Sequence, residues 1–360
     1  MHELQLQKPD GRQLTLYSRQ PIDPTLQAPS PQRIALQPNP HLRWQPLRGE
    51  WVAYAPYRQN RTFLPPPDYN PLRPSSDPEF PSEMPVGDYD IAVFDNLFPS
   101  MSSNSHDPPQ SIVATAPADG QCEVVVFTQD PSTTLSRLPL AHIELLLEVW
   151  ADRTERIARN PQIRYVQPFE NRGAEVGVTL HHPHGQIYAY PFVPPVPARM
   201  HHNEAQHFKK HGKTLLQGLI EAELKDAQRM IYRGEHAVAF VPAWARYPYE
   251  VWIATVAAVP DFASLSTVQR ADLARALKTT LLKYDGLWQQ PFPYLMGWYQ
   301  APMNFPERAA VHLHAEILPP YRMKGRLKYL AGTELAAGMF ANDALPEEKA
   351  RELQAVEVVI

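Results

Sequence analysis

The feature that most restricts the fold of this chain is an order of predicted elements that occurs twice. A β-branched strand comes first, a long helix with apolar residues at helical spacing follows, and two strands separated by a turn complete the set. The last strand of each set carries His-x-His, so His182 and His184 correspond to His312 and His314. We therefore expect an α+β fold with a duplicated unit, antiparallel sheets, and helices packed on one face.

The two sets occupy consecutive parts of the chain. The first is predicted as a strand at 122–127, a helix at 137–159 and two strands within 163–192. The second is predicted as a helix at 213–232, strands at 237–241 and 250–257, a helix at 266–284 with Ser266 or Thr267 as N-cap, and strands at 293–300 and 311–318.

Proline is a second constraint, because the chain holds 40 prolines among 360 residues. Proline fixes its own φ and restricts the residue before it, so the stretches 21–46, 65–85 and 191–197 are predicted as extended segments or loops. The length allows two domains of ordinary size. The predicted organisation is an N-terminal arm at 1–40, halves at 41–205 and 206–345, and a tail at 346–360.

Charge and cysteine content exclude several classes of protein. Lys plus Arg number 34 and Asp plus Glu number 38, and the net charge of −4 gives no reason to expect a nucleic acid or an anionic membrane as partner. The one cysteine, Cys122, allows neither an internal disulfide nor a Cys-x-x-Cys site. No segment has the apolar length of a signal peptide or a membrane span, so the cytoplasm is the expected compartment.

The segment 171–195 holds the densest group of candidate functional residues. Alternate residues of a strand share one face. Here that face would carry His182, His184, Gln186, Tyr188 and Tyr190. So many polar groups in a row do not build a core, and we expect them to line a cleft.

An imidazole in such a cleft is suited to attack on phosphorus. Its pKa of about 6.5 leaves it largely neutral near pH 7, and the N-phosphoryl product is reactive enough to pass the group on. Two in-line displacements would then retain the configuration at phosphorus. Gly185 would let a phosphate approach closely, and Gln186 could donate a hydrogen bond to a phosphoryl oxygen.

Each group of histidines also has a plainer interpretation. An isolated His-x-His strand is more often structural, or a pair of metal ligands, than a nucleophile. The series His312, His314 and Glu316 would need a further ligand to hold a metal, so a hydrogen-bonded polar face is favoured. His207 and His211 have the i, i+4 spacing of a metal clamp, but a solvated helix start is favoured.

The longer sequence around these histidines resembles a known family. HPHGQIYAYPF at 182–192 is similar to the active-site motif of the galactose-1-phosphate uridylyltransferases, in the histidine-triad superfamily. The resemblance extends over roughly residues 40 to 340, in family order. It includes FDNLFP at 94–99, FENRGAEVG at 169–177, VPAWARYPYE at 241–250, RADLARALKTTLLKYDGL at 270–287, FPYLMGWYQAP at 292–302 and LHAEILPP at 313–320.

The resemblance assigns roles by position. His184 would be the uridylylated nucleophile and His182 would orient its neighbours, while Gln186 would favour transfer over hydrolysis. Other positions match family contacts to the nucleotide, its phosphates and the hexose phosphate: Asn96, Asn171, Gly173, Thr179, Lys328 and Glu334. Arg58 and Arg61 match an arginine pair that reaches the active site of the partner subunit, which implies a homodimer.

Departures from the family concern its metal sites. Zinc-binding members carry Cys-x-x-Cys where this chain has DYNPLRP at 68–74, and a further zinc histidine is replaced by Pro131, leaving only His182. At the second metal site Met200, Tyr299 and Glu316 stand in place of ligands, and only His314 matches. One or two ligands rarely hold a structural metal, so no metal or other cofactor is expected.

The resemblance implies a ping-pong enzyme. UDP-glucose would uridylylate His184 with release of glucose 1-phosphate, and galactose 1-phosphate would accept the group. One alternative is an adenylyl-transferring phosphorylase acting on ADP-glucose or a dinucleoside polyphosphate, with the same nucleophile. Another is a nucleotide- or metal-binding protein without turnover, whose histidines serve only as ligands.

Overall fold

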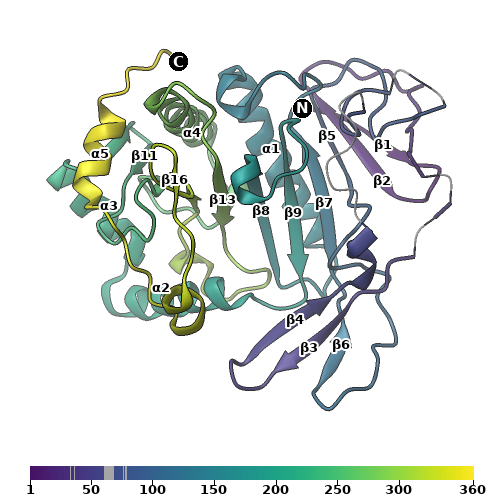
Figure 1. Ribbon diagram of the computed structural model, residues 1–360, viewed down its shortest axis with the longest axis horizontal. Coiled ribbons are helices and arrows are strands. Elements are labelled where there is room, and N and C mark those ends of the chain that lie inside the picture. Colours follow the sequence, from purple (N-terminus) through teal and green to yellow (C-terminus); the bar gives the residue numbers. More distant parts are fainter. Residues whose placement is uncertain (33, 36, 61–68, 76, 78) are drawn as a thin grey trace.

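Eleven strands of the chain join in one sheet, and every neighbouring pair is antiparallel (Figure 1). This computed structural model describes residues 1–32, 34–35, 37–60, 69–75, 77 and 79–360. In spatial order the strands are β1 (His2–Gln7), β2 (Gln13–Ser18), β5 (Ile91–Asp95), β7 (Gln121–Val126), β9 (His184–Tyr190), β8 (Tyr165–Arg172), β13 (Tyr294–Tyr299), β14 (His314–Leu318), β12 (Val251–Thr255), β11 (Ala237–Phe240) and β10 (Met230–Arg233).

The predicted duplication is visible in this order. The strands β5, β7, β9 and β8 are repeated in mirror order as β13, β14, β12 and β11, and the two sets meet where β8 pairs with β13. Within its own half, each of β8 and β13 would be an edge strand, and their pairing satisfies the backbone N–H and C=O groups of both. The halves therefore share one continuous sheet instead of the separate sheets that the sequence suggested.

The two long helices lie on one face of the sheet, as predicted. They are α1 (Leu140–Ile157) and α4 (Thr267–Leu287), which contact each other. Trp150 of α1 packs against Trp298 of β13, with ring centroids 5.7 Å apart, so the core is continuous across the halves. A capping box at Ser266 starts α4, which confirms one of the two predicted N-caps.

A further helix covers the opposite face, so the expectation that the helices share one face holds only for α1 and α4. The strand β11 is buried on both sides, with Ala237 and Ala239 toward the main core and Val238 and Phe240 toward α3 (Leu215–Asp226). The predicted helix at 213–232 ends early, because Ala227 adopts a left-handed conformation (φ 59°) and β10 begins soon after it.

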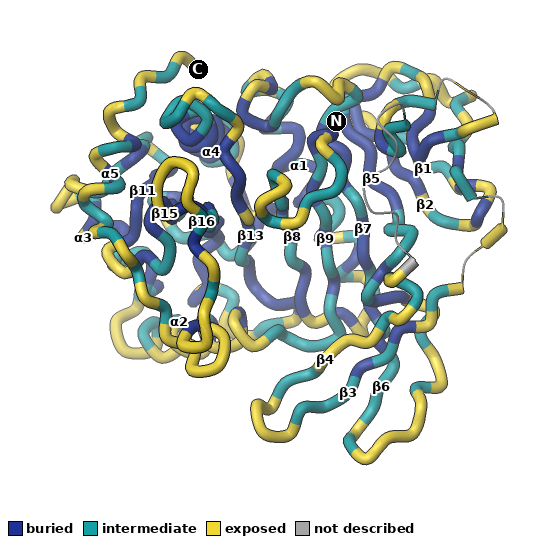
Figure 2. Tube along the Cα trace, in the orientation of Figure 1, coloured by how far each residue is buried: buried dark blue, intermediate teal, exposed yellow. Residues whose placement is uncertain are grey.

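The start of the chain belongs to the sheet, although the sequence suggested a polar arm over 1–40. The hairpin β1–β2 extends the sheet beyond β5, and Leu14, Leu16 and Tyr17 are fully buried there. Figure 2 shows β2 mostly buried, whereas β1 at the edge of the sheet is partly exposed. The domain boundaries at 40, 205 and 345 stay a prediction.

The remaining elements are short. A three-stranded sheet of β4 (Glu50–Tyr54), β3 (His41–Gln45) and β6 (Thr115–Pro117) projects from the body (Figure 1). The others are η1 (Pro56–Asn60), α2 (Pro195–His211), β15 (Tyr321–Met323), β16 (Arg326–Leu327) and α5 (Pro346–Gln354). Among the described residues, no helix combines the length and the apolar composition that crossing a membrane requires.

Candidate functional site

The strand β9 presents the predicted polar face. Ile187 and Ala189 point into the main core, while His184 and Gln186 are only partly buried and line a cavity. A side chain at Gly185 would come within 2.8 Å of the Phe127 ring and 2.7 Å of the Phe169 carbonyl oxygen. The close packing of strand and core therefore requires glycine here, whereas the sequence analysis gave the approach of a phosphate as the reason.

The hydrogen bonding of His184 fixes its tautomer. Its Nδ1 lies 2.7 Å from the carbonyl oxygen of His182. A carbonyl only accepts, so Nδ1 carries the proton and Nε2 carries the lone pair. No described residue is hydrogen-bonded to Nε2. Burial lowers the pKa of His184, opposed by the bond to His182, so the ring is neutral and able to act as a nucleophile near pH 7.

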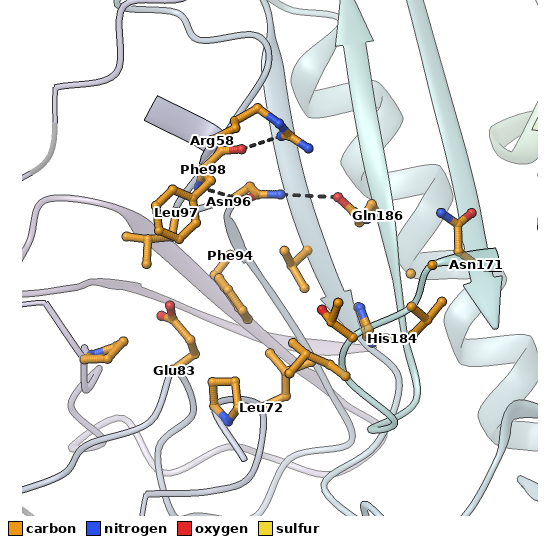
Figure 3. A pocket seen from close by; sticks show the side chains of 18 of the residues that line it. Arg58, Leu72, Glu83, Phe94, Asn96, Leu97, Phe98, Asn171, His184 and Gln186 are labelled. Atoms are coloured by element: carbon orange, nitrogen blue, oxygen red, sulfur yellow. Dashed lines mark hydrogen bonds between the residues drawn. The ribbon is translucent and has the colours of Figure 1, made fainter. Parts of the chain in front are cut away.

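The cavity at His184 has a volume of about 430 Å³. Figure 3 shows His184 and Gln186 on one side of it, with Leu97 and Glu83 across from them. Its other lining residues are Pro31, Gln32, Arg58, Tyr69, Pro71, Leu72, Phe94, Asn96, Phe98, Val124, Asn171, Gly177, Val178, Thr179, Leu180 and Gly185. Apolar walls with a few polar groups are typical of a small-molecule site.

Gln186 is oriented by a neighbour that the sequence also singled out. Asn96 Nδ2 donates to Gln186 Oε1 at 3.2 Å, and Asn96 Oδ1 accepts from the backbone of Phe98 at 2.8 Å (Figure 3). Because its carbonyl oxygen is engaged, the amide NH2 of Gln186 remains available to donate to a ligand oxygen. Arg58 donates to the Phe98 carbonyl at 2.5 Å and lines the cavity of its own chain.

His182 does not line the cavity but lies directly behind His184. Its Nε2 donates to the Thr128 carbonyl at 2.6 Å, and its Nδ1 lies 3.1 Å from Asn70 Nδ2. Burial lowers the pKa of His182, so it too is neutral at physiological pH. These contacts fit the orienting role that the resemblance implies, and the role stays a prediction.

The structure brings some of the other predicted residues to the cavity and leaves others away from it. Asn171 and Thr179 line it. Gly173 does not; its φ of 99° favours glycine, and an added Cβ would lie 2.5 Å from Pro293 Cβ. Lys328 and Glu334 also lie elsewhere, paired with each other at 3.6 Å. Arg61 falls outside the described residues.

The second His-x-His repeats the backbone geometry of the first beside a smaller cavity of about 190 Å³, which His312 and His314 line. His314 Nδ1 donates to the His312 carbonyl at 2.8 Å, as His184 does to His182. The rings of Trp252 and Tyr299 stack on the two sides of His314, with centroids 5.0 and 5.1 Å away. This position is therefore enclosed by aromatic side chains.

His312 and Glu316 of this strand region have protein partners. His312 uses both ring nitrogens, 3.2 Å from Thr214 Oγ1 and 2.8 Å from the Thr255 carbonyl, and Glu316 pairs with Arg246 at 2.5 Å. In the part of the chain that the structure describes, no three His, Cys, Asp or Glu side chains are arranged to hold a metal. The contacts are those of a hydrogen-bonded polar face.

A buried ion cluster beside the cavity was missed by the sequence analysis. Lys8 Nζ and Arg12 Nη2 lie 2.9 and 2.8 Å from Glu83 Oε2, and Arg12 also pairs with Asp10 at 2.7 Å. Lys8 Nζ lies 4.9 Å from the centre of the Phe94 ring. No local pattern reveals this cluster, because its members are brought together only when the β1–β2 turn packs against the segment around Glu83.

Known proteins share the sequence and fold of this chain. The models described as "Galactose-1-phosphate uridyl transferase, N-terminal domain" and "C-terminal domain" match residues 32–194 and 201–359. The galactose-1-phosphate uridylyltransferase of Thermotoga maritima is 37% identical over 325 residues, which is 89% of this chain and 99% of that protein.

Two solved structures extend the comparison. A uridylyltransferase superposes with a TM-score of 0.78 at 33% identity, over 88% of this chain and 98% of that one. An ADP-glucose phosphorylase from Arabidopsis thaliana, with bound ADP-glucose, gives a TM-score of 0.66 at 27% identity, over 89% of this chain and 100% of that one.

Fold and site together define the class of protein: a duplicated α+β unit with a histidine of a His-x-His strand lining a cavity. Within that class, the chain belongs to the galactose-1-phosphate uridylyltransferase family. The resemblance inferred from roughly residues 40 to 340 is thus confirmed and extends slightly beyond both ends.

Proposed function

We propose that this chain transfers a uridylyl group from UDP-glucose to galactose 1-phosphate through a covalent intermediate on His184. The observation that carries the proposal is that His184 lines the cavity with Nδ1 held 2.7 Å from the His182 carbonyl, while no described residue is hydrogen-bonded to its Nε2. The choice of substrates is supported by the Thermotoga maritima relative and its name.

The first step forms one bond and breaks one. His184 Nε2 attacks the α-phosphorus of UDP-glucose, and the bond from that phosphorus to the bridging oxygen breaks, releasing glucose 1-phosphate. The attacking ring gains positive charge, which the His182 carbonyl stabilises through the Nδ1–H. In the second step a phosphate oxygen of galactose 1-phosphate attacks the same phosphorus, the P–N bond breaks, and UDP-galactose leaves.

The negative charge on the phosphoryl oxygens requires hydrogen-bond donors near His184 in the cavity. The free amide NH2 of Gln186 and the guanidinium of Arg58 supply them, and Asn171 and Thr179 offer further polar groups on the wall. The apolar surface of Phe94 and Leu97 would receive the base.

A second candidate is adenylyl transfer, favoured by the fold similarity to the ADP-glucose phosphorylase. Mass spectrometry of the intact protein after separate exposure to UDP-glucose and ADP-glucose distinguishes the candidates, because each adduct has its own mass. We expect the uridylyl adduct with stoichiometric release of glucose 1-phosphate. An adenylyl adduct would favour the phosphorylase, and the absence of any adduct would favour a binding protein without turnover.

The nucleophile assignment has its own test. We expect His184→Ala to abolish both the adduct and the transfer while the far-UV circular dichroism stays unchanged. The matched control is His314→Ala, which removes the repeated histidine of the other half and should still form the adduct. Transfer by His184→Ala above trace level would remove His184 from the mechanism.

We also propose a cytoplasmic homodimer, as the resemblance implies. Lys328 and Glu334 lie away from the cavity of their own chain, so their expected contact with the hexose phosphate would be made across a subunit interface. The division at 41–205 and 206–345 is likewise a proposal, supported by the separate matches to 32–194 and 201–359. Sedimentation equilibrium measures the oligomeric state directly.

A further inference from the structure

Asn70 is linked to the nucleophile through a single histidine. Asn70 Nδ2 lies 3.1 Å from His182 Nδ1, and the carbonyl of His182 accepts the Nδ1–H of His184 at 2.7 Å. His182 Nε2 already donates to the Thr128 carbonyl at 2.6 Å. One proton is therefore on Nε2, and the bare Nδ1 accepts from Asn70.

The orientation of the Asn70 amide is fixed from the other side. Its Oδ1 accepts from the backbone of Leu72 at 3.0 Å, so the nitrogen must be the atom that faces His182. Tyr69, Pro71 and Leu72 line the cavity on either side of Asn70. The same short segment thus forms part of the cavity wall and holds the ring behind the nucleophile.

The other half of the chain contains the same arrangement built from a different donor. His312 donates Nε2–H to the Thr255 carbonyl at 2.8 Å, its Nδ1 lies 3.2 Å from Thr214 Oγ1, and its own carbonyl accepts from His314 at 2.8 Å. In both His-x-His units, a side chain from a distant part of the sequence therefore contacts Nδ1 of the first histidine. The repetition argues against a chance contact at Asn70.

We propose that Asn70 is a positioning residue for the transfer reaction, which rests on the function proposed above. By donating to His182 Nδ1, Asn70 keeps His182 in the Nε2–H tautomer and fixes the orientation of its ring. The backbone carbonyl of His182, which orients His184, is thereby held in place as well. Among the described residues, the Asn70 amide makes the side-chain contact to Nδ1 of His182. The resemblance implies that zinc-binding members of the family have a metal at this histidine instead. The contact is neutral and needs no ion.

The direct test removes the donor and keeps the shape. Asn70→Leu is nearly isosteric and cannot donate to His182, and it also removes the oxygen that accepts from the Leu72 backbone. The loss of the donor to His182 corresponds to roughly a ten- to hundredfold slower formation of the uridylyl adduct in a single turnover. The dissociation constant for UDP-glucose should change by less than about threefold, because the nucleotide wall is retained. The matched control, Thr214→Val, removes the equivalent bond in the other half together with the N-cap bond that Thr214 accepts from the Gln217 backbone, and it should leave both values unchanged.

A spectroscopic measurement reports the proposed contact itself. In ¹⁵N-histidine NMR spectra the wild type should show His182 with a protonated Nε2 and a hydrogen-bonded, unprotonated Nδ1. In Asn70→Asp the acceptor carboxylate should place a proton on Nδ1, while Nε2 keeps the proton that it donates to the Thr128 carbonyl. A wild type with protonated Nδ1 would overturn the proposal, whatever the kinetics.

The kinetic outcomes separate the two proposals. If the wild type forms the adduct and Asn70→Leu forms it at the same rate, the positioning role is wrong and the function stands. If Thr214→Val slows the adduct as much as Asn70→Leu, the effect is general destabilisation and the positioning role is wrong. If the wild type forms no adduct with UDP-glucose or ADP-glucose, the proposed function fails, and the tautomer measurement alone then decides whether Asn70 holds His182.

Discussion

Replacing Lys8 by methionine should weaken the structure around the cavity, although Lys8 is far from His184 in sequence. The residue is 2% exposed, and its ammonium group donates to the Pro29 carbonyl at 3.0 Å, to the Glu83 carbonyl at 2.6 Å and to Glu83 Oε2 at 2.9 Å. Residues before 32 lie outside the matched family region, so this contact ties a segment outside that region to a wall of the site.

The magnitude follows from what the substitution leaves behind. Methionine fills a similar volume, but three acceptor positions lose a buried donor. Removing one partner of a buried ion pair costs about 3–5 kcal/mol, and Arg12 still binds Glu83, so we expect the lower end, about 3 kcal/mol. Since Glu83 and Pro31 line the cavity, the dissociation constant for UDP-glucose should also rise several-fold.

Equilibrium urea unfolding followed by circular dichroism measures this loss. The control Lys210→Met replaces an exposed lysine and should stay within about 0.5 kcal/mol of the wild type. The double variant Lys8→Met/Glu83→Gln removes one charge of each sign. Its loss of unfolding free energy should be smaller than the summed losses of the two single variants by at least about 1 kcal/mol. A loss below about 1 kcal/mol for Lys8→Met, or strict additivity, would refute the reasoning.

Two further predictions concern pH and metals. Burial raises the pKa of Glu170 from 4.5 to about 7, although the hydrogen bond from Tyr294 and the charge of Arg172 oppose the shift. The stability that Glu170 contributes is therefore complete below about pH 4.5 and is lost as the pH rises through 7. The shift in pKa corresponds to about 3 kcal/mol of unfolding free energy. Thermal unfolding between pH 5 and 8 should therefore show a flatter profile for Glu170→Gln, and an unchanged slope would contradict the assignment. Transfer activity should persist after exhaustive chelation, because His182 is hydrogen-bonded to Asn70 and Glu316 is paired with Arg246. The prediction would be wrong if chelation removed both a bound metal, measured by mass spectrometry, and the activity.

The strand that carries His184 could be predicted because its information is local. Alternation along 184–190 separates His184 and Gln186, which line the cavity, from Ile187 and Ala189, which face the main core. The expectation that Tyr188 and Tyr190 also line the cleft was wrong, because they pack against a smaller apolar cluster around Cys122. The duplicated order of strand, helix and two strands was equally local, and it predicted the symmetric halves. Periodicity needs only neighbouring residues, so the chain displays it without a fold.

Contacts between distant segments could not be predicted in the same way. The pairing of β8 with β13, which merges the halves into one sheet, depends on which edge each unit leaves open. The side chains on His182 and His312 come from Asn70 and Thr214, 112 and 98 residues away along the chain. Nothing in their local sequence indicates those partners.

By itself, the sequence determined the class of fold, the repeat and the histidine that faces the cavity, because these follow from short-range patterns and from a motif of adjacent residues. Only the tertiary structure decided how the tautomer of that histidine is held, why aromatic rings stack on His314 of the other His-x-His, and which N-terminal charges pair with Glu83 at the cavity wall. Those properties depend on burial and on angstrom-scale distances between groups far apart in the chain, which exist only after the segments have packed together.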